Sequence, residues 1–284
     1  MAYVPPPGEK DLEKIVRSIR NAHERLDAIL YIPQSRGIDC YNNASTPTTK
    51  FDLDADEIML RTSTGAGAVR INPGSAITND TGSAGPVTNG RDQSGAFSNS
   101  TWLHFYWIWD GTTLATISST VAPPTGPTFP TGYTHWAYAG AVFKDSGGNL
   151  HNVRIKGSMV FRDVIGSALS GGSGTSETTV SLTSFIPPNA LSVSISSVGT
   201  LTTNAGGAAS ENVLLRHVSG SNGAAFGVYV EIASSTSSQV AAFDFPNVSQ
   251  QVFYLWSNIA GPANVNTRSL TMHVRGYRVP NGGE

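Results

Sequence analysis

The sequence predicts a mainly β protein, in which an N-terminal helix precedes two antiparallel β domains of the sandwich or jelly-roll type. Two observations support this: charged residues are concentrated at the start of the chain, and glycine and proline interrupt the rest every few residues. The 284 residues include 30 glycines and 16 prolines, and only 13% are charged, about half the usual quarter. This length allows one large core or two ordinary ones.

The first 40 residues differ from the remainder because they hold 12 of the 38 charged side chains. Prolines 5–7 cannot enter a helix interior. The acids that follow them suit a first helical turn, where they complement the positive end of the helix dipole. We therefore predict a helix from about Glu9 to Leu30.

Apolar residues recur within this helix at alternating intervals of three and four, which is the spacing of a coiled-coil seam. The β-branched Ile15 and Ile29 fall at d positions, which disfavours a parallel dimer and favours trimers or tetramers. The alternative is an amphipathic helix docked on its own domain, since isolated helices of this length are marginal in water. The seam consists of Leu12, Ile15, Ile19, Ala22, Leu26 and Ile29.

From Tyr41 onward, short apolar runs separated by turn residues predict many short strands without helices between them, which is typical of antiparallel sheets. Strict alternation in the last run, where Leu270, Met272 and Val274 share one face, predicts one buried and one polar side. The predicted strands are Glu57–Arg61, Ala68–Asn72, Trp102–Trp109, Thr112–Ser119, His135–Phe143, Asn152–Phe161, Thr179–Thr183, Ser192–Val198, Val213–Val218, Gly227–Ile232, Gln251–Trp256 and Ser269–Val279.

Residues 166–178 are rich in glycine and serine, a composition typical of a flexible linker. Cutting there predicts an N-terminal segment (1–40), a β domain (41–165), the linker and a C-terminal β domain (179–284). The last domain has only eight charged residues in 106. Its surface therefore consists of hydroxyls, amides and glycine, which suits a durable extracellular protein and interfaces between subunits.

The overall charge argues against several classes of partner. The net charge of −2 gives no general attraction to nucleic acid or to anionic lipid. No run of about 18 apolar residues predicts a membrane span, and the N-terminus lacks the order of a secretion signal. The single cysteine, Cys40, is expected to be a packed or loop thiol.

Motifs for catalysis or cofactor binding are missing. No G-x-S-x-G elbow is present, and the glycine-rich run at 65–70 lacks the third glycine of a dinucleotide fingerprint. The six histidines have no metal-binding spacing, so we expect no metal and no cofactor. In the acidic run, Asp52, Asp54 and Asp56 share one side of an extended chain; we interpret it as a solvated strand edge, with weak calcium binding as the alternative.

The segment Trp102–Trp109 carries large rings on both faces of a predicted strand. This pattern favours a central strand buried between two layers. If some rings are exposed, they offer a platform for stacking sugars, because an aromatic face is a large and rigid contact surface. The candidate glycan contacts are Trp102, Trp107, Trp109 and Trp256.

The stretch from Trp102 to Phe143 resembles a β domain of tail and fibre proteins of tailed bacteriophages, with an aromatic strand, a loop at Pro127–Thr134 and a strand ending near Gly140. The segment Tyr3–Asp11 and its helix look like the N-terminal attachment segment of short virion proteins. The C-terminal half, with Phe185–Pro188 near its start and Val274–Tyr277 near its end, is similar in texture to fibre-tip domains.

This resemblance implies a homotrimeric virion component, assembled in the host cytoplasm and acting outside the cell, and it identifies no catalytic residues. Its N-terminus would bind other virion proteins of the tail, neck or capsid, and its β domains would bind a host-surface glycan. The anchoring residues would be Tyr3, Val4, Pro5, Pro6, Pro7 and Gly8.

Three alternatives remain open. The same architecture fits a head fibre or capsid decoration protein without a specific receptor. A polysaccharide depolymerase would need paired acids, for which Asp110, Asp145 and Asp163 are the candidates near loop ends. A bacterial carbohydrate-binding module would be a monomer.

Overall fold

The computed structural model describes residues 35–62, 67–260 and 262–281. Residues 35–284 form one compact unit. The predicted helix, its apolar seam and the anchoring residues 3–8 lie outside the described residues.

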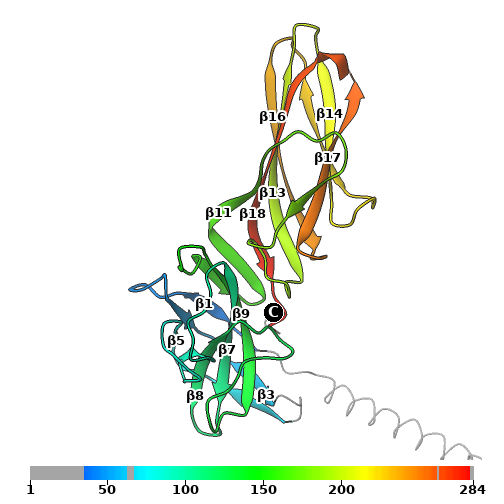
Figure 1. The fold of residues 1–284 in the computed structure, drawn as a ribbon. Coiled ribbons are helices and arrows are strands. Elements are labelled where there is room, and N and C mark those ends of the chain that lie inside the picture. Colours follow the sequence, from blue (N-terminus) through cyan, green and yellow to red (C-terminus); the bar gives the residue numbers. More distant parts are fainter. Residues whose placement is uncertain (1–34, 63–66, 261, 282–284) are drawn as a thin grey trace, which may run out of the picture. The chain divides into compact units, whose positions relative to one another are not determined.

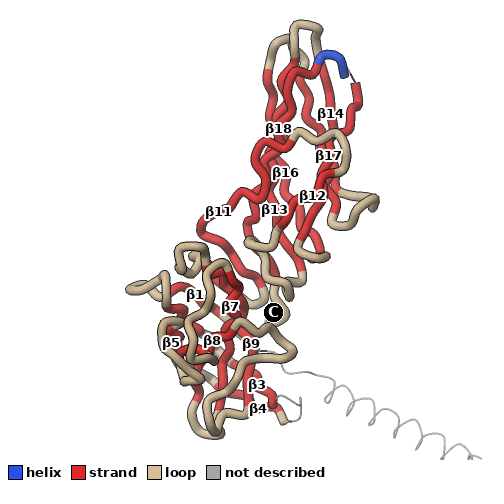
Figure 2. The backbone as a smooth tube through the Cα atoms, in the orientation of Figure 1, coloured by secondary structure: helices blue, strands red, loops and turns tan. Residues whose placement is uncertain are grey.

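The described part of the chain is mainly β, as predicted, and its strands form three sheets (Figures 1 and 2). All twelve predicted segments overlap observed strands, whereas β1, β2, β5, β6 and β16 were missed. The strands are β1 (Asp39–Asn42), β2 (Lys50–Leu53), β3 (Ile58–Thr62), β4 (Ala68–Ile71), β5 (Ile77–Asp80), β6 (Gly90–Arg91), β7 (Thr101–Trp109), β8 (Leu114–Ser119), β9 (His135–Lys144), β10 (Val153–Lys156), β11 (Met159–Gly172), β12 (Thr178–Ser181), β13 (Ser192–Thr203), β14 (Ala209–Arg216), β15 (Ala224–Val230), β16 (Thr236–Pro246), β17 (Gln251–Ala260) and β18 (Val265–Arg278), with one 3-10 turn, η1 (Pro262–Asn264), before β18.

An eight-stranded sheet, in the order β16-β13-β18-β11-β10-β1-β2-β5, runs through the unit. The six-stranded sheet β4-β3-β9-β7-β8-β6 packs on the end that contains β1 and β2, where the rings of Phe51 and Phe105 lie 4.7 Å apart. The four-stranded sheet β12-β17-β14-β15 packs on the end that contains β16 and β13. There Gly199 lets the sheets approach closely, because a Cβ atom at this position would lie 2.9 Å from both Phe226 and Val228.

Nearly all the described pairings are antiparallel, as expected. The exception is the two-residue strand β6, which pairs in parallel with β8.

The prediction of a flexible linker at 166–178 is wrong for its first part. Strand β11 continues to Gly172 and pairs with β18, so the backbone groups of these residues are satisfied by a neighbouring strand. The indole nitrogen of Trp256 also donates a hydrogen bond of 3.1 Å to the carbonyl of Gly172. Glycine and serine here permit irregular pairing rather than chain flexibility, as the register shifts along β11 show.

The predicted cut into separate domains at 41–165 and 179–284 also disagrees with the strand pairing, because the eight-stranded sheet contains strands from both sides of the cut. Side-chain hydrogen bonds join the two halves as well. Trp102 donates from its indole nitrogen to the carbonyl of Thr183 at 2.8 Å, and the amide of Asn281 donates to the carbonyl of Ala139 at 2.9 Å. Sequence composition does not record such pairings between distant segments.

The aromatic strand β7 lies between β8 and β9 in the six-stranded sheet, and its residues from Trp102 to Ile108 are all buried. The interpretation of this segment as a central strand covered on both faces is therefore confirmed.

Candidate binding groove

The pairing of β18 with both its neighbours becomes irregular at one place. On one side, Phe161 of β11 pairs with Gly276, and the next pair is Gly166 with Val274. On the other side, Ser194 of β13 pairs with Gly276, and the next pair is Ile195 with Val274. Bulges of this kind redirect side chains, and they are common next to functional sites.

Two basic residues lie in these irregular stretches. Arg275 has no opposite residue on either neighbouring strand, and Arg162, which pairs with Val153 of β10, has none on β18. The bulge on β18 thus takes Arg275 out of the regular pairing of the sheet.

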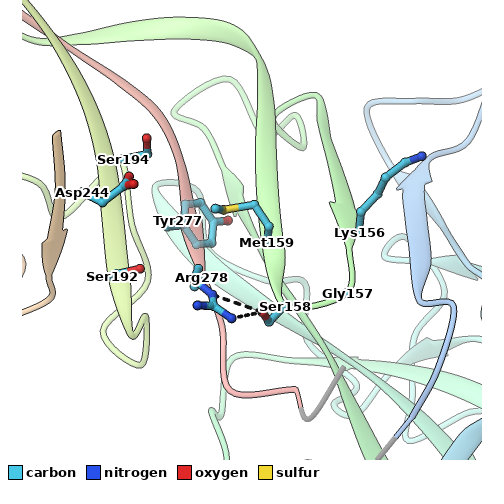
Figure 3. Close-up of a pocket in the computed structure, with 9 residues that line it drawn as sticks. All are labelled: Lys156, Gly157, Ser158, Met159, Ser192, Ser194, Asp244, Tyr277 and Arg278. Atoms are coloured by element: carbon cyan, nitrogen blue, oxygen red, sulfur yellow. Dashed lines mark hydrogen bonds between the residues drawn. The ribbon is translucent and has the colours of Figure 1, made fainter. Parts of the chain in front are cut away.

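Two adjoining cavities open at this point, and both contain Met159 and Ser194; together we call them the bulge groove. In Figure 3, Ser192, Ser194 and Asp244 lie on one side of the larger cavity and Lys156 lies on the other. This cavity, of about 430 Å³, is lined by Lys156, Gly157, Ser158, Met159, Ser192, Ser194, Asp244, Tyr277 and Arg278. The smaller cavity, of about 300 Å³, is lined by Met159, Phe161, Arg162, Ser194, Arg275 and Gly276.

Gly276 keeps the middle of the groove open. It stands between Phe161 and Ser194 in the sheet and has no side chain to fill the space between them. A Cβ atom here would lie 2.3 Å from the carbonyl oxygen of Val160, which is backbone and cannot rotate away. The close approach of β11 and β18 therefore requires glycine at this position.

The groove is positively charged although the whole chain carries a net charge of −2. Of the 18 lysine and arginine residues, four line it, against a single acid, Asp244. Arg278 donates hydrogen bonds of 3.0 and 3.2 Å to the hydroxyl of Ser158 (Figure 3), and the ammonium of Lys156 lies 4.0 Å from Asp39. Clustered cations with one acid attract an anionic ligand.

Arg162 is held by neutral partners. Its guanidinium donates to the carbonyl of Phe185 and to Nδ1 of His151, both at 3.1 Å, and lies 5.2 Å from the centre of the Phe185 ring. Burial lowers the pKa of Arg162, but a guanidinium stays charged at neutral pH. Within the described residues no carboxylate forms an ion pair with it, so no acid there neutralises its charge.

An exposed aromatic ring adjoins these charges. Phe161 is 49% exposed, although most large apolar side chains of β11 and β18 are covered. The groove therefore combines an open ring face, serine hydroxyls and cations. Sequence reasoning missed this site, and the only signal for it was a glycine next to an arginine inside a strongly alternating strand.

The candidate glycan contacts lie elsewhere. Trp107 is fully buried and Trp256 is 2% exposed, so the prediction that these rings contact a glycan is wrong. The physical reason is that a second sheet covers the face of each strand on which they lie. Trp109 is partly buried and stacks edge-on against His135 at 5.5 Å, and Trp102 is 8% exposed.

Trp102 does line a third cavity of about 440 Å³, formed with Ser100, Thr101, His104, Thr120, Ala122, Phe143, Thr183, Ser184 and Pro188. Among the residues that line it, the titratable side chain is His104, and its Nδ1 lies 3.0 Å from the hydroxyl of Tyr138. Asn189 donates to the same hydroxyl at 3.1 Å. Burial lowers the pKa of His104 to about 4, so the ring is neutral near pH 7. This cavity offers no charge to a ligand.

The acidic run does not form a solvated strand edge, because β2 lies between β1 and β5. Asp52 is buried and accepts hydrogen bonds from Asn43 and from the hydroxyl of Thr78. Glu57 is paired with Arg70. Among the described residues, no group of three or more histidine, cysteine or acidic side chains is placed to hold a metal ion.

The three acids considered for polysaccharide cleavage lie in separate places. Asp110 follows β7 and accepts hydrogen bonds from the backbone of Thr112 and Thr113, which lower its pKa. Asp145 lies in the turn after β9 and accepts from the backbone of Asn149. Asp163 accepts from Asn152 at 2.6 Å. None of the three lines any of the cavities described above.

Cys40 is fully buried in β1, so the expectation of a packed thiol is confirmed. Its thiol donates to the carbonyl of Asp54 at 3.8 Å, and burial raises its pKa. A neutral thiol of this kind is unreactive.

In the described part of the chain, no helix has the length and apolarity that crossing a membrane requires. The sequence matches no protein-family model and no curated protein.

Proposed function

We propose that this chain is a structural protein of a bacteriophage virion. It forms a homotrimeric fibre or spike that is anchored to other virion proteins by its N-terminus and projects its β-sandwich units toward the host surface. The resemblance of residues 1–30 and 102–143 to such proteins motivates the proposal. The observation that carries it is the distribution of exposed apolar side chains, which favours contact between copies of the chain.

Among the described residues, seven of the nine exposed large apolar side chains belong to the C-terminal part of the chain, where charge is scarcest. Single exposed apolar residues are normal, but this part of the chain carries most of them, on strands of two sheets and on the loops between strands. They are Leu191, Val218, Tyr229, Ile232, Val240, Val248 and Ile259, and Val240 is the most exposed at 71%.

Strand β16 supports the same conclusion, because it forms an edge of the eight-stranded sheet. It is eleven residues long, contains no lysine and carries a single charge, Asp244. Natural monomers protect long edges with lysine, bulges or short strands. On its outer face, Val240 pairs with Val198, beside a hydroxyl pair between Thr200 and Ser238 at 2.8 Å. A face that consists mostly of small, uncharged side chains, with Asp244 as its one charge, suits a subunit interface.

The oligomeric state tests the proposal directly. We expect sedimentation equilibrium of the full chain at micromolar concentration to give three times the 29.9 kDa of one chain. A stable monomer under these conditions would contradict the proposal.

Two variants locate the contacts. Val240→Lys places a charge on the exposed edge strand β16 and is expected to weaken the trimer, whereas Val121→Lys, at a residue 38% exposed outside the C-terminal part, is the matched control. Ile19→Asp tests the predicted seam in the same measurement. If neither Val240→Lys nor Ile19→Asp changes the mass, both proposed contacts are wrong.

The position on the particle separates the two kinds of virion protein. Gold labelling of the C-terminus is expected to decorate the tail region if the chain is a tail fibre. Labelling over the capsid would instead support a head fibre or decoration protein. Particles that contain no label would contradict a virion role.

A further inference from the structure

We infer that the bulge groove binds an acidic saccharide, in which the carboxylate of a uronic acid-type sugar is held by the arginines and the sugar ring lies on Phe161. The inference rests on the proposed host-surface role of the β domains for the source of such a ligand. The site itself is argued from the residues that line the groove.

The charge of the groove selects an anion. Arg275 is exposed, and within the described residues it forms no ion pair. Arg162 lines the same cavity and is held only by a carbonyl, an imidazole and a ring. A planar guanidinium binds a carboxylate through two parallel hydrogen bonds, so the exposed Arg275, with Arg162 in the same cavity, suits a carboxylate-bearing ligand.

The other lining residues favour a sugar. A sugar ring has an apolar face that stacks on an aromatic side chain, and Phe161 presents such a ring at the rim of the smaller cavity. Ser192 and Ser194 supply hydroxyls that can donate to or accept from sugar hydroxyls. Asp244, across the larger cavity, is an acceptor for further hydroxyls.

The dimensions agree with a chain rather than a single small anion. Each cavity falls at the lower end of the range of ligand pockets, roughly 300–1,000 Å³. Because the cavities adjoin, consecutive sugars of one chain can occupy both. A nucleic acid fits less well, because its backbone requires a longer track of cations and several stacking rings, and the chain has a net charge of −2.

Calorimetric titration of the full chain tests the inference with chemically matched probes. An unbranched oligogalacturonate is expected to bind, and its methyl ester, which keeps the ring and hydroxyls but loses the charge, is expected to bind at least about tenfold more weakly. A glycerol phosphate oligomer of similar charge is the third probe. Tighter binding of the phosphate oligomer than of the oligogalacturonate would overturn the assignment to a carboxylate.

Variants show whether binding occurs in the groove. Arg275→Gln is expected to weaken oligogalacturonate binding about tenfold, since it removes a charge-assisted hydrogen bond. Phe161→Ala is expected to weaken binding of both the acid and the ester. Lys50→Gln, which removes one partly exposed cation that pairs with Asp80 outside the groove, is the control and should leave affinity unchanged. Both groove side chains are exposed, so the variants should unfold at the same temperature as the parent protein.

Equal affinity of the parent protein and of Arg275→Gln for oligogalacturonate would place the site elsewhere and overturn the inference, as would equal affinity for the acid and its ester. This failure is distinct from failure of the proposed function. If the protein is a trimer but does not bind oligogalacturonate, only the inferred groove ligand is refuted. If the protein is a monomer that binds oligogalacturonate, only the proposed trimer is refuted.

Discussion

The hydroxyl of Tyr277 donates a hydrogen bond of 2.7 Å to the backbone carbonyl of Ala141, 136 residues earlier in the chain. Tyr277 is 1% exposed, and its ring meets Trp102 edge-on at 5.6 Å. Burial raises the pKa of the Tyr277 phenol, so it remains a donor. Strand β18, the last of the chain, is thereby joined to β9 in the six-stranded sheet.

Replacing Tyr277 with phenylalanine should lower the free energy of unfolding by about 1–2 kcal/mol, because it removes a buried hydrogen bond and keeps the ring. Urea denaturation monitored by tryptophan fluorescence measures this change. Tyr229→Phe, at a side chain 54% exposed, is the control and should leave stability unchanged. Equal midpoints for the parent and Tyr277→Phe would show that the contact contributes nothing.

A second prediction concerns Arg268 and Glu211, which join β18 to β14 through two hydrogen bonds of 2.5 Å. The side chain of Glu211 is 1% exposed. Arg268→Met should lower the free energy of unfolding by about 3 kcal/mol, because it leaves the buried carboxylate of Glu211 without its guanidinium partner. Arg154→Met breaks a similar pair with Asp39 at the surface and should cost at most about 1 kcal/mol. Denaturant titration of the two variants compares these costs, and equal losses would contradict the role assigned to burial.

The pH dependence of stability should reflect His104. Burial lowers its pKa from the usual 6.5 to about 4, so between these values the unfolded chain binds a proton that the folded chain does not. The free energy of unfolding is therefore unaffected by the protonation of His104 above pH 6.5. It falls as the pH is lowered from 6.5 toward 4, by up to about 3 kcal/mol.

His104→Gln removes the titrating group and keeps a polar side chain near Tyr138. We expect its unfolding free energy to change less than that of the parent between pH 7.5 and pH 4.5. Because burial also lowers the pKa of His151, some dependence should persist in the variant. The same pH profile in both proteins would refute the assignment to His104.

Gly276→Ala tests the packing of the groove floor. The added methyl would meet the carbonyl of Val160, so β11 and β18 must separate, at a cost of about 1–3 kcal/mol. Gly95→Ala is a control, since its nearest neighbouring atom would be 3.9 Å away. Thermal unfolding compares the two variants. A Gly276→Ala protein as stable as the control would show that these strands can shift freely.

Local pattern was sufficient to predict the strands that alternate clearly or carry a continuous apolar run, such as Trp102–Trp109. It was insufficient for β16, whose serine, glutamine and alanine residues lack alternation because the strand lies at an edge with most of its side chains exposed. The glycine-rich stretch at 166–172 was predicted as a linker, because amino-acid composition indicates only the conformational freedom of an isolated segment and not its pairing with another strand. Pairing with β18 determined its conformation instead.

The sequence by itself determined the mainly β class, the break in charge near residue 40 and the burial of the aromatic strand, since each follows from residue types over a few consecutive positions. Only the tertiary structure decided which strands share a sheet, that Trp107 and Trp256 face other sheets, and that Lys156, Arg162, Arg275 and Arg278 converge on one groove. Their convergence depends on two bulges and on Gly276, which bring together side chains from β10, β11 and β18. Contacts between segments so far apart in the chain leave no periodic signal in any one of them.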